Sequence, residues 1–245
     1  MKRLVVLGFG AFAYVSFLGV FAVLVDFLVN AGFIRGIDHG PAESVPVAVA
    51  INLALVALFG VSHSVLARPA VKARCEQLIP QVLERSTYVL VANGVLALMV
   101  WQWRSLPDSI WSVTLAPVRV VIWALFGGGI ALVIVATFLT DHFDLFGLRQ
   151  VWLYARGKEY APVPFRMRGL YKWIRHPMML GIFAMLWATP SMSVGHLLFA
   201  VGMSVYIVVG VAFEERALLR SLGKPYEEYR RRVRAFLPSG PSRRP

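Results

Sequence analysis

Arg175 and His176 stand directly before a proline and a long apolar stretch, and Glu214 and Glu215 directly follow that stretch. If the stretch folds back on itself, the two pairs lie at the same membrane level and face each other. An arginine can bind a carboxylate through two hydrogen bonds, and carboxylates can bind an ammonium group or hydroxyls. The four residues therefore suit a zwitterionic ligand, although ordinary boundary charges paired as ion bridges would give the same pattern.

A second group of candidate residues lies in the tail that follows. Tyr226, Tyr229, Val233 and Phe236 recur at helical spacing, with arginines between them. A helix with this pattern is amphipathic and lies in the membrane interface. We expect a helix here, serving either as a lipid-surface anchor only or as part of the site beside the two acids.

His63, His142 and Asp141 are candidates for moving a proton. Asn52 and His63 are eleven residues apart, which puts them within about 20° of each other on one helix face. A polar stripe inside a span should face the bundle or a cavity, although a histidine near a span end could simply reach water. Asp141 stands beside His142 and could orient its imidazole as a general base, or both could be the solvated end of a helix.

These candidates belong to a chain with the composition of a membrane protein. Of its 245 residues 58% are hydrophobic, and the mean hydropathy is +0.66. Soluble domains are about 45–50% apolar. Runs of roughly 20 residues with few charges predict spans over about 4–29, 45–67, 87–103 and 118–140.

The apolar stretch 177–213 is too long for one span and contains Pro190. Its first part, Met178 to Thr189, would be only about 18 Å long as a helix at 1.5 Å per residue. We therefore expect a short helix that turns back into a full one. The predicted fold is all-α: a polytopic membrane helical bundle with about five spans, the last a helical hairpin, and a cytoplasmic amphipathic C-terminal helix.

The basic residues are unevenly distributed between the loops. With the N-terminus placed in the cytoplasm, 22 of the 25 Lys and Arg residues fall on the cytoplasmic side, and only Arg35, Arg104 and Arg119 fall on the other. The positive-inside rule then predicts that both termini are cytoplasmic. Anionic lipid headgroups account for the net charge of +12, so no nucleic-acid partner is expected.

Two further features limit the possibilities. The single Cys75 excludes an internal disulfide, and no residues are spaced like a zinc or iron–sulfur site, so no metal is expected. Lys2 and Arg3 precede an apolar run, as in a signal peptide. That run is longer than the 7–15 residues of a signal peptide and lacks a cleavage site, so we retain it as a span.

The spans predict a single membrane domain, 1–245. It has four spans in 1–140, a cytoplasmic loop over 141–176, and the hairpin with the C-terminal helix in 177–238. The loop is long for a helix–helix connection, and loops of this length are usually functional or disordered. Its many aromatic residues argue against disorder.

"RHPMMLG", about 30 apolar residues and "EERALLRSLGKPYEEYRRRVRAFLPS" together resemble the C-terminal signature of a superfamily of integral-membrane methyltransferases. Its members are related to isoprenylcysteine carboxyl methyltransferase and phospholipid methyltransferases. The signature consists of RHP, a glycine or small residue, a double acid, G-x-x-Y-x-x-Y and F-[IL]-P. The residues that match it are Arg175, His176, Pro177, Gly181, Glu214, Glu215, Gly223, Tyr226, Tyr229, Phe236, Leu237 and Pro238.

The resemblance implies a binding site for S-adenosylmethionine. The arginine and histidine would lie near the methionine part, the two glutamates on the amino or ribose groups, and a tyrosine of the tail at the cofactor's cover. Where the family usually has an aromatic residue, this chain has Met179, which leaves stacking to Tyr171 or Trp173. The implied cofactor-binding residues are Tyr171, Arg175, His176, Pro177, Gly181, Glu214, Glu215, Tyr226 and Tyr229.

Two more stretches, "GVSHSVLARPAVKARCEQLIPQVLERSTYVLVANGVLALMVWQWRSLP" and "DHFDLFGLRQVWLY", are similar to the methanethiol S-methyltransferases. These are bacterial membrane enzymes that convert methanethiol to dimethyl sulfide. The resemblance extends over about residues 50–238. Proteins similar to the denitrification-associated NnrU group share the five-span character and a stretch like His63–Ser64.

The resemblance implies that the chain uses S-adenosylmethionine to methylate a small volatile thiol, and that His63, His142 or Asp141 takes the thiol proton. Two alternatives stay open: methylation of a lipid amine or a prenylcysteine carboxylate, and a non-catalytic NnrU-like membrane subunit. Bulky residues around "VWQWRSLP" favour a small substrate over a lipid, and the converging charges argue against the subunit. The expected partners are the thiol and membrane lipids; the sequence predicts no particular oligomeric state.

Overall fold

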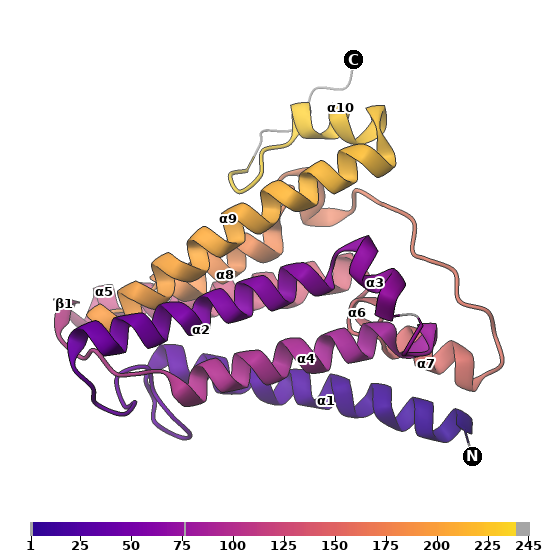
Figure 1. Ribbon diagram of the computed structural model, residues 1–245. Helices are drawn as coiled ribbons and strands as arrows, with labels where there is room; N and C mark the ends of the chain where they lie inside the picture. The colour runs from indigo at the N-terminus through magenta and orange to yellow at the C-terminus, as the bar shows by residue number, and fades with distance from the viewer. Residues whose placement is uncertain (1, 76, 239–245) are drawn as a thin grey trace. The chain divides into compact units, whose positions relative to one another are not determined.

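The computed structural model describes residues 2–75 and 77–238, and this part of the chain is mostly helical (Figure 1). Five of its helices, of 22 to 29 residues, are long and apolar enough to cross a membrane. At 1.5 Å per residue they measure about 33–44 Å, enough for a hydrocarbon core of about 30 Å. They are α1 (Lys2–Val29), α2 (Val45–Leu66), α4 (Gln81–Gln102), α5 (Ala116–Leu139) and α9 (Val194–Leu222). The predicted all-helical, multi-pass membrane fold is confirmed.

The helix α4 begins six residues before the span predicted over 87–103. Its first six residues include the polar Gln81, Glu84, Arg85 and Ser86, so the apolar pattern does not reveal them. A carboxylate in the first turn favours a helix start, because the amino end of a helix carries a partial positive charge. Hydropathy therefore located the span in the membrane but not the start of the helix.

The shorter elements fall mostly in the segments predicted as loops. The segment 141–176 contains two short helices and a 3₁₀ turn, and residues 158–168 between them have no regular secondary structure. Two short strands form the only sheet in the part of the chain that the structure describes. These elements are α3 (Pro69–Cys75), β1 (Ser109–Ser112), α6 (His142–Leu145), α7 (Leu148–Ala155), η1 (Gly169–Lys172), α8 (Pro177–Trp187), β2 (Ser191–Ser193) and α10 (Lys224–Arg232).

The last apolar stretch folds as the predicted helical hairpin. The short helix α8 has 11 residues, about 16 Å, and the chain turns through Pro190 and β2 before α9 begins. The indole nitrogen of Trp187, at the end of α8, donates a hydrogen bond of 3.0 Å to the hydroxyl of Ser204 on α9. The side chains of the two arms therefore meet near the turn.

Contacts divide the described residues into two compact units. The first unit consists of Met1–Ile110, Asp141–Pro164 and Met192–Phe199. The second unit consists of Trp111–Thr140, Phe165–Ser191 and Ala200–Pro245. The expected single domain over 1–245 stays a prediction.

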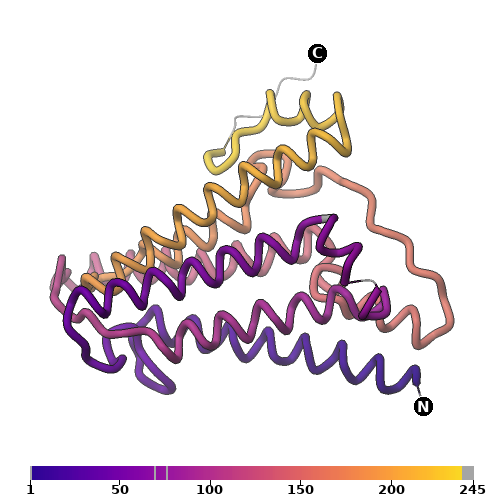
Figure 2. The backbone as a smooth tube through the Cα atoms, viewed as in Figure 1, coloured from indigo at the N-terminus to yellow at the C-terminus, as the bar shows by residue number. Residues whose placement is uncertain are grey.

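In the first unit, α4 packs against α1 and α2, and α7 packs against α1 and α4 (Figures 1 and 2). One end of this unit is held by Phe27, Trp103 and Phe199, whose rings meet edge to face with centroids 5.3–6.0 Å apart. At the same end the buried Asn52 amide donates to the carbonyl of Arg104 and accepts from its N–H, each at 2.9 Å. Asn52 therefore serves as a cap for the chain that leaves α4, and no described contact joins it to His63.

In the second unit, α8 packs along α5 at two glycines. A methyl group on Gly181 would lie 2.7 Å from the carbonyl oxygen of Gly129 and 2.9 Å from a methyl group of Val133. Small residues let helix backbones approach closely in membranes, where lipid is as apolar as the side chains. The glycine at position 181 is thus required by helix packing.

Replacing Gly181 by alanine should destabilise the protein. Alanine is about 1 kcal/mol better than glycine inside a helix, but an inserted methyl group in a tight contact costs roughly 1–3 kcal/mol. Thermal unfolding of the detergent-purified chain should show a lower Tm for Gly181→Ala. The matched control is Gly128→Ala, because a methyl group there meets nothing within 4 Å. Equal Tm values for the two variants would contradict the tight contact.

Candidate active site

The segment around Arg175 and His176 is fixed by pairing with the end of the described chain. The N–H of Arg175 donates to the carbonyl of Arg234 at 2.9 Å, and the N–H of His176 donates to the carbonyl of Ala235 at 3.0 Å. Ile174 and Arg234 form a parallel bridge. These contacts join two segments about 60 residues apart into one wall.

This pairing corrects part of the tail prediction. The helix α10 contains Tyr226 and Tyr229 but ends at Arg232, so Val233 and Phe236 are not on it. At Val233 the backbone becomes extended, with φ −115° and ψ 129°. Residues 234 and 235 then offer their carbonyls to the segment before α8, which a continued helix would have used internally.

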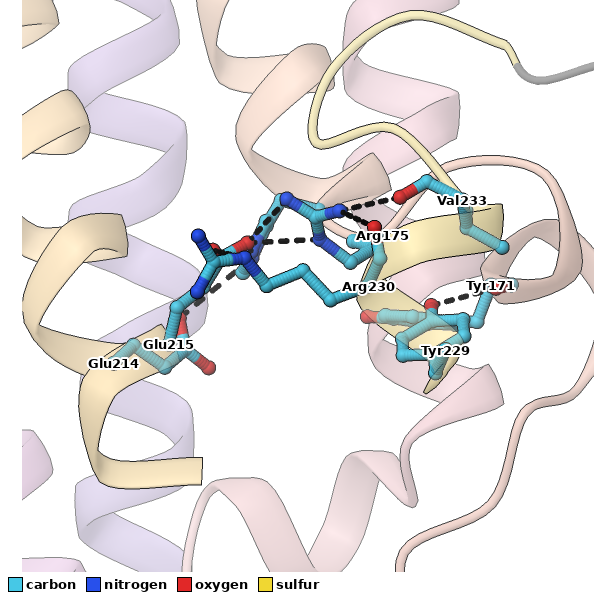
Figure 3. A network of polar contacts seen from close by, with 8 residues as sticks. Tyr171, Arg175, Glu214, Glu215, Tyr229, Arg230 and Val233 are labelled. Atoms are coloured by element: carbon cyan, nitrogen blue, oxygen red, sulfur yellow. Dashed lines mark hydrogen bonds and ion pairs between the residues drawn. The ribbon is translucent and has the colours of Figure 1, made fainter. Parts of the chain in front are cut away.

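The guanidinium of Arg175 joins three segments (Figure 3). Its Nε and one terminal nitrogen lie 2.8 and 2.7 Å from the carboxylate of Glu215 on α9. The other terminal nitrogen donates to the carbonyl of Arg230, at 2.8 Å, and to that of Val233. Carbonyls at the end of a helix lack partners within the helix, so Arg175 closes the end of α10. Its contacts are those of a brace, and they leave little of the guanidinium for a cofactor carboxylate.

The two adjacent glutamates have different surroundings. The side chain of Glu215 is only 12% exposed and accepts from Arg175 and from Nε2 of His176, the latter at 3.1 Å; Nε of Arg230 lies 3.5 Å from its second oxygen. The side chain of Glu214 is 53% exposed, and one of its carboxylate oxygens lies 3.7 Å from Nδ1 of His176. Glu214 thus has an accessible carboxylate, whereas Glu215 is an internal counterion.

Tyr226 and Tyr229, both on α10, pack against each other with ring centroids 5.8 Å apart. Tyr226 and Tyr229 are buried with Val233, and the hydroxyl of Tyr229 donates to the carbonyl of Tyr171 at 2.6 Å. Burial raises the pKa of Tyr226 and that of Tyr171 to about 12, and it raises the pKa of Tyr229 as well. All three phenols therefore keep their protons at neutral pH. Their contacts support α10; a role as cover for the cofactor stays a prediction.

Phe236 and Arg230 were not among the implied cofactor-binding residues, yet both lie beside the charged residues. The Phe236 ring is 6.1 Å from the His176 ring, centroid to centroid, and meets Phe183 edge to face at 5.3 Å. Phe236 was matched in the F-[IL]-P motif, which was a usable signal. Pro177 begins α8 and so directs the chain that leaves His176.

The proton-transfer candidates belong to the first unit. Nε2 of His63 is 2.7 Å from the hydroxyl of Tyr88 on α4, and its ring stacks on Phe59 with centroids 5.4 Å apart. Tyr88 in turn lies under the guanidinium of Arg85. Tyr88 was missed because a tyrosine inside a span carries no motif of its own.

His142 and Asp141 take separate roles. His142 is 7% exposed, and its Nε2 is 2.8 Å from the hydroxyl of Tyr14 on α1. Burial lowers the pKa of His142, so its ring is neutral at pH 7. The carboxylate of Asp141 accepts from the N–H of Asp144 at 3.2 Å and caps α6. Asp141 therefore forms the polar start of α6, and the imidazole of His142 contacts the hydroxyl of Tyr14.

The sequence of this chain matches a known protein family. The family model described as "NnrU protein" matches residues 52–238. The chain belongs to the NnrU family. The resemblance to NnrU proteins predicted from the sequence is therefore confirmed as family membership.

Curated relatives are similar over nearly the full length. The chain is 47% identical to "Methanethiol S-methyltransferase" of Mycobacterium tuberculosis over 97% of this chain and 98% of that protein. It is 40% identical to the protein of the same name from Crocosphaera subtropica over 97% of this chain and 93% of that protein. "Nurim" of Danio rerio is 26% identical over 83% of each chain. No solved structure matches the chain. The resemblance to methanethiol S-methyltransferases predicted from the sequence is confirmed.

The bracing role of Arg175 predicts that Arg175→Lys loosens the end of the chain. A lysine keeps the charge, but its single ammonium cannot reach the carboxylate and both carbonyls at once. Leaving such groups unsatisfied costs roughly 1–3 kcal/mol. Hydrogen exchange followed by mass spectrometry should show about tenfold faster exchange over residues 224–238.

The control for this measurement is Arg231→Lys, which lies on α10, the helix whose exchange is followed. Arg231 is 75% exposed and pairs with Glu227 one turn away, a contact that lysine can keep. If both variants exchange at the parent rate, Arg175 does not brace the tail.

Proposed function

We propose that this chain transfers the methyl group of S-adenosylmethionine to methanethiol, which loses its thiol proton, and so forms dimethyl sulfide and S-adenosylhomocysteine. The observation that carries the proposal is the 47% identity to a methanethiol S-methyltransferase over 97% of this chain and 98% of that protein. The geometry of the second unit supports it, because an accessible carboxylate, a histidine and several aromatic rings meet on one wall.

The donor set of this wall fits the cofactor. S-adenosylmethionine has an ammonium group and ribose hydroxyls, which the exposed carboxylate of Glu214 can bind. Phe236, Tyr171 and Trp173 are aromatic residues on the same segments and suit a flat base. Arg175, Glu215 and Tyr229 hold these segments in place, while Pro177 and Gly181 fix the start and the packing of α8. When bound, the cofactor supplies an electrophilic methyl group on a sulfonium.

The thiol must lose a proton, because the thiolate is the nucleophile and a free thiol has a pKa of about 8.5. His63 and His142 each place Nε2 within 2.8 Å of a tyrosine hydroxyl. A neutral imidazole with an oriented ring can accept a proton, and the tyrosine fixes that orientation. We propose His63 first and His142 second. Asp141 is third, because its carboxylate already caps α6.

A small volatile thiol suits a site beside membrane spans, since it is apolar enough to dissolve in hydrocarbon. Excluding water also favours the reaction, because a thiolate and a sulfonium neutralise each other as the bond forms. The bulky residues in the stretch "VWQWRSLP" also favour a small substrate over a lipid.

The reaction is tested by gas chromatography of the headspace above the purified chain with S-adenosylmethionine and methanethiol. The parent should release dimethyl sulfide. Glu214→Gln keeps the size of the side chain but removes the charge, so the KM for S-adenosylmethionine should rise at least tenfold. Glu227→Gln, an exposed acid on α10, is the control and should match the parent. Absence of dimethyl sulfide from a parent that binds the cofactor would sink the assignment of methanethiol.

The same assay distinguishes the two imidazoles. Tyr88→Phe removes the partner of His63, and Tyr14→Phe removes the partner of His142. One of the two histidines acts as the base, and the variant that removes its tyrosine partner should lower kcat and shift the pH profile of kcat. The KM for S-adenosylmethionine should stay unchanged. If neither variant changes the pH profile of kcat, the positioning of the two reactants alone accounts for the rate.

We also propose that both termini lie in the cytoplasm and that the membrane is a bacterial inner membrane. The segments that would be cytoplasmic contain 22 of 25 basic residues. The positive-inside rule supports this orientation for loops of such length.

Cys75 offers a direct test of orientation because it is the only cysteine in the chain and is partly exposed. A membrane-impermeant maleimide should label it only after the cells are permeabilised. The control is Cys75→Ser combined with Ser109→Cys, since Ser109 is exposed on β1 and would lie outside. This variant should be labelled in intact cells; the reverse pattern would invert the topology.

A further inference from the structure

The first unit contains a polar cavity that the methyl-transfer proposal does not use. Its volume is about 660 Å³, within the roughly 300–1,000 Å³ typical of small-molecule sites. It lies where spans end, since its lining comes from the starts of α1 and α4, from α3, and from the segment around α7. The cavity belongs to the first unit alone.

The cations that line this cavity outnumber the acids available to neutralise them. Lys72 pairs with Glu84 at 3.0 Å, but among the described residues Arg3, Arg85 and Lys158 form no ion pair with an acid. The carboxylate of Asp144 is neutralised by Arg149, at 2.9 Å. One lining acid, Glu159, is left against three cations. The cavity is therefore suited to an anion.

The backbone adds to this positive character. The helix α4 begins at the cavity with Gln81 and Val82, and no side chain caps its first N–H groups. The amino end of a long helix attracts anions through these N–H groups and through its dipole. At Gly157, φ is +68°, and a methyl group there would lie 3.4 Å from the guanidinium of Arg3. The guanidinium of Arg3 therefore lies beside this backbone at the cavity.

Gln150 indicates a second property of the ligand. Its residue is 9% exposed, and its Nε2 donates to the carbonyl of Asp144 at 3.2 Å, which fixes the orientation of the amide. Its Oε1 has no hydrogen-bond partner among the described residues. A buried acceptor without a partner destabilises the folded state. A hydroxyl group of a ligand would satisfy it after displacing the side chains that cover this oxygen.

We propose that this cavity binds a phosphate ester that also carries hydroxyl groups. The phosphate lies among Arg3, Arg85, Lys158 and the start of α4, and a hydroxyl donates toward Gln150. Two sources have this chemistry: the headgroup of an anionic lipid such as phosphatidylglycerol, and a soluble polyol phosphate. The site shares no residue with the proposed methyl-transfer site, so it stands or fails separately.

Native mass spectrometry of the purified full chain tests the proposal with phosphatidylglycerol, phosphatidylcholine and glycerol 3-phosphate as probes. The variant is Arg3→Glu with Lys158→Glu. The matched control is Arg166→Glu with Arg168→Glu, which makes the same charge change at two exposed arginines that do not line the cavity. Circular dichroism checks that each variant is folded, and Arg3→Gln with Lys158→Gln is a milder variant if reversal disrupts folding.

We expect phosphatidylglycerol to bind at least tenfold more tightly than phosphatidylcholine, and the cavity variant to lose this preference while the control keeps it. That result identifies the lipid as the source. Binding of glycerol 3-phosphate with the same dependence on the cavity variant identifies a soluble source. If neither probe binds preferentially, or if the control loses binding as much as the cavity variant, the proposal is wrong.

Discussion

The Arg175–Glu215 ion pair is the contact on which the candidate cofactor site depends. Both side chains are nearly buried, at 10% and 12% exposure, and the guanidinium also takes up two carbonyls from the end of the chain. Breaking a buried pair leaves an unsatisfied charge, which costs far more than an exposed pair contributes. The segment before α8, the helix α9 and the tail are therefore linked through one side chain.

That arrangement gives two adjacent acids different functions. Consecutive residues on a helix point about 100° apart, so Glu215 can face Arg175 while Glu214 faces outward. His176 lies between them, with one ring nitrogen toward each carboxylate. A double acid is thus more than a local increase in charge: one residue holds the scaffold and the other remains available to a ligand.

The sequence predicted the spans, the hairpin and the closeness of Arg175 and His176 to the two glutamates, because hydropathy and topology determine these. It did not predict that α10 ends at Arg232, since helical spacing continues to Phe236 and only the pairing of residues 234 and 235 with the chain before α8 ends the helix. Tyr14 and Tyr88 were missed for a related reason. Each tyrosine contacts its histidine from an element that is distant in the sequence, and a single sequence does not reveal such a contact.

The pairing of residues 175–176 with 234–235 also affects the order of folding. The N–H groups of Arg175 and His176 obtain their carbonyl partners only from the segment after α10. During synthesis, a chain that has already inserted all five described spans would still lack this wall. Membrane insertion and completion of the site are therefore separate events, and a nascent chain cannot bind a ligand at this wall before the helices that surround it are already in the bilayer.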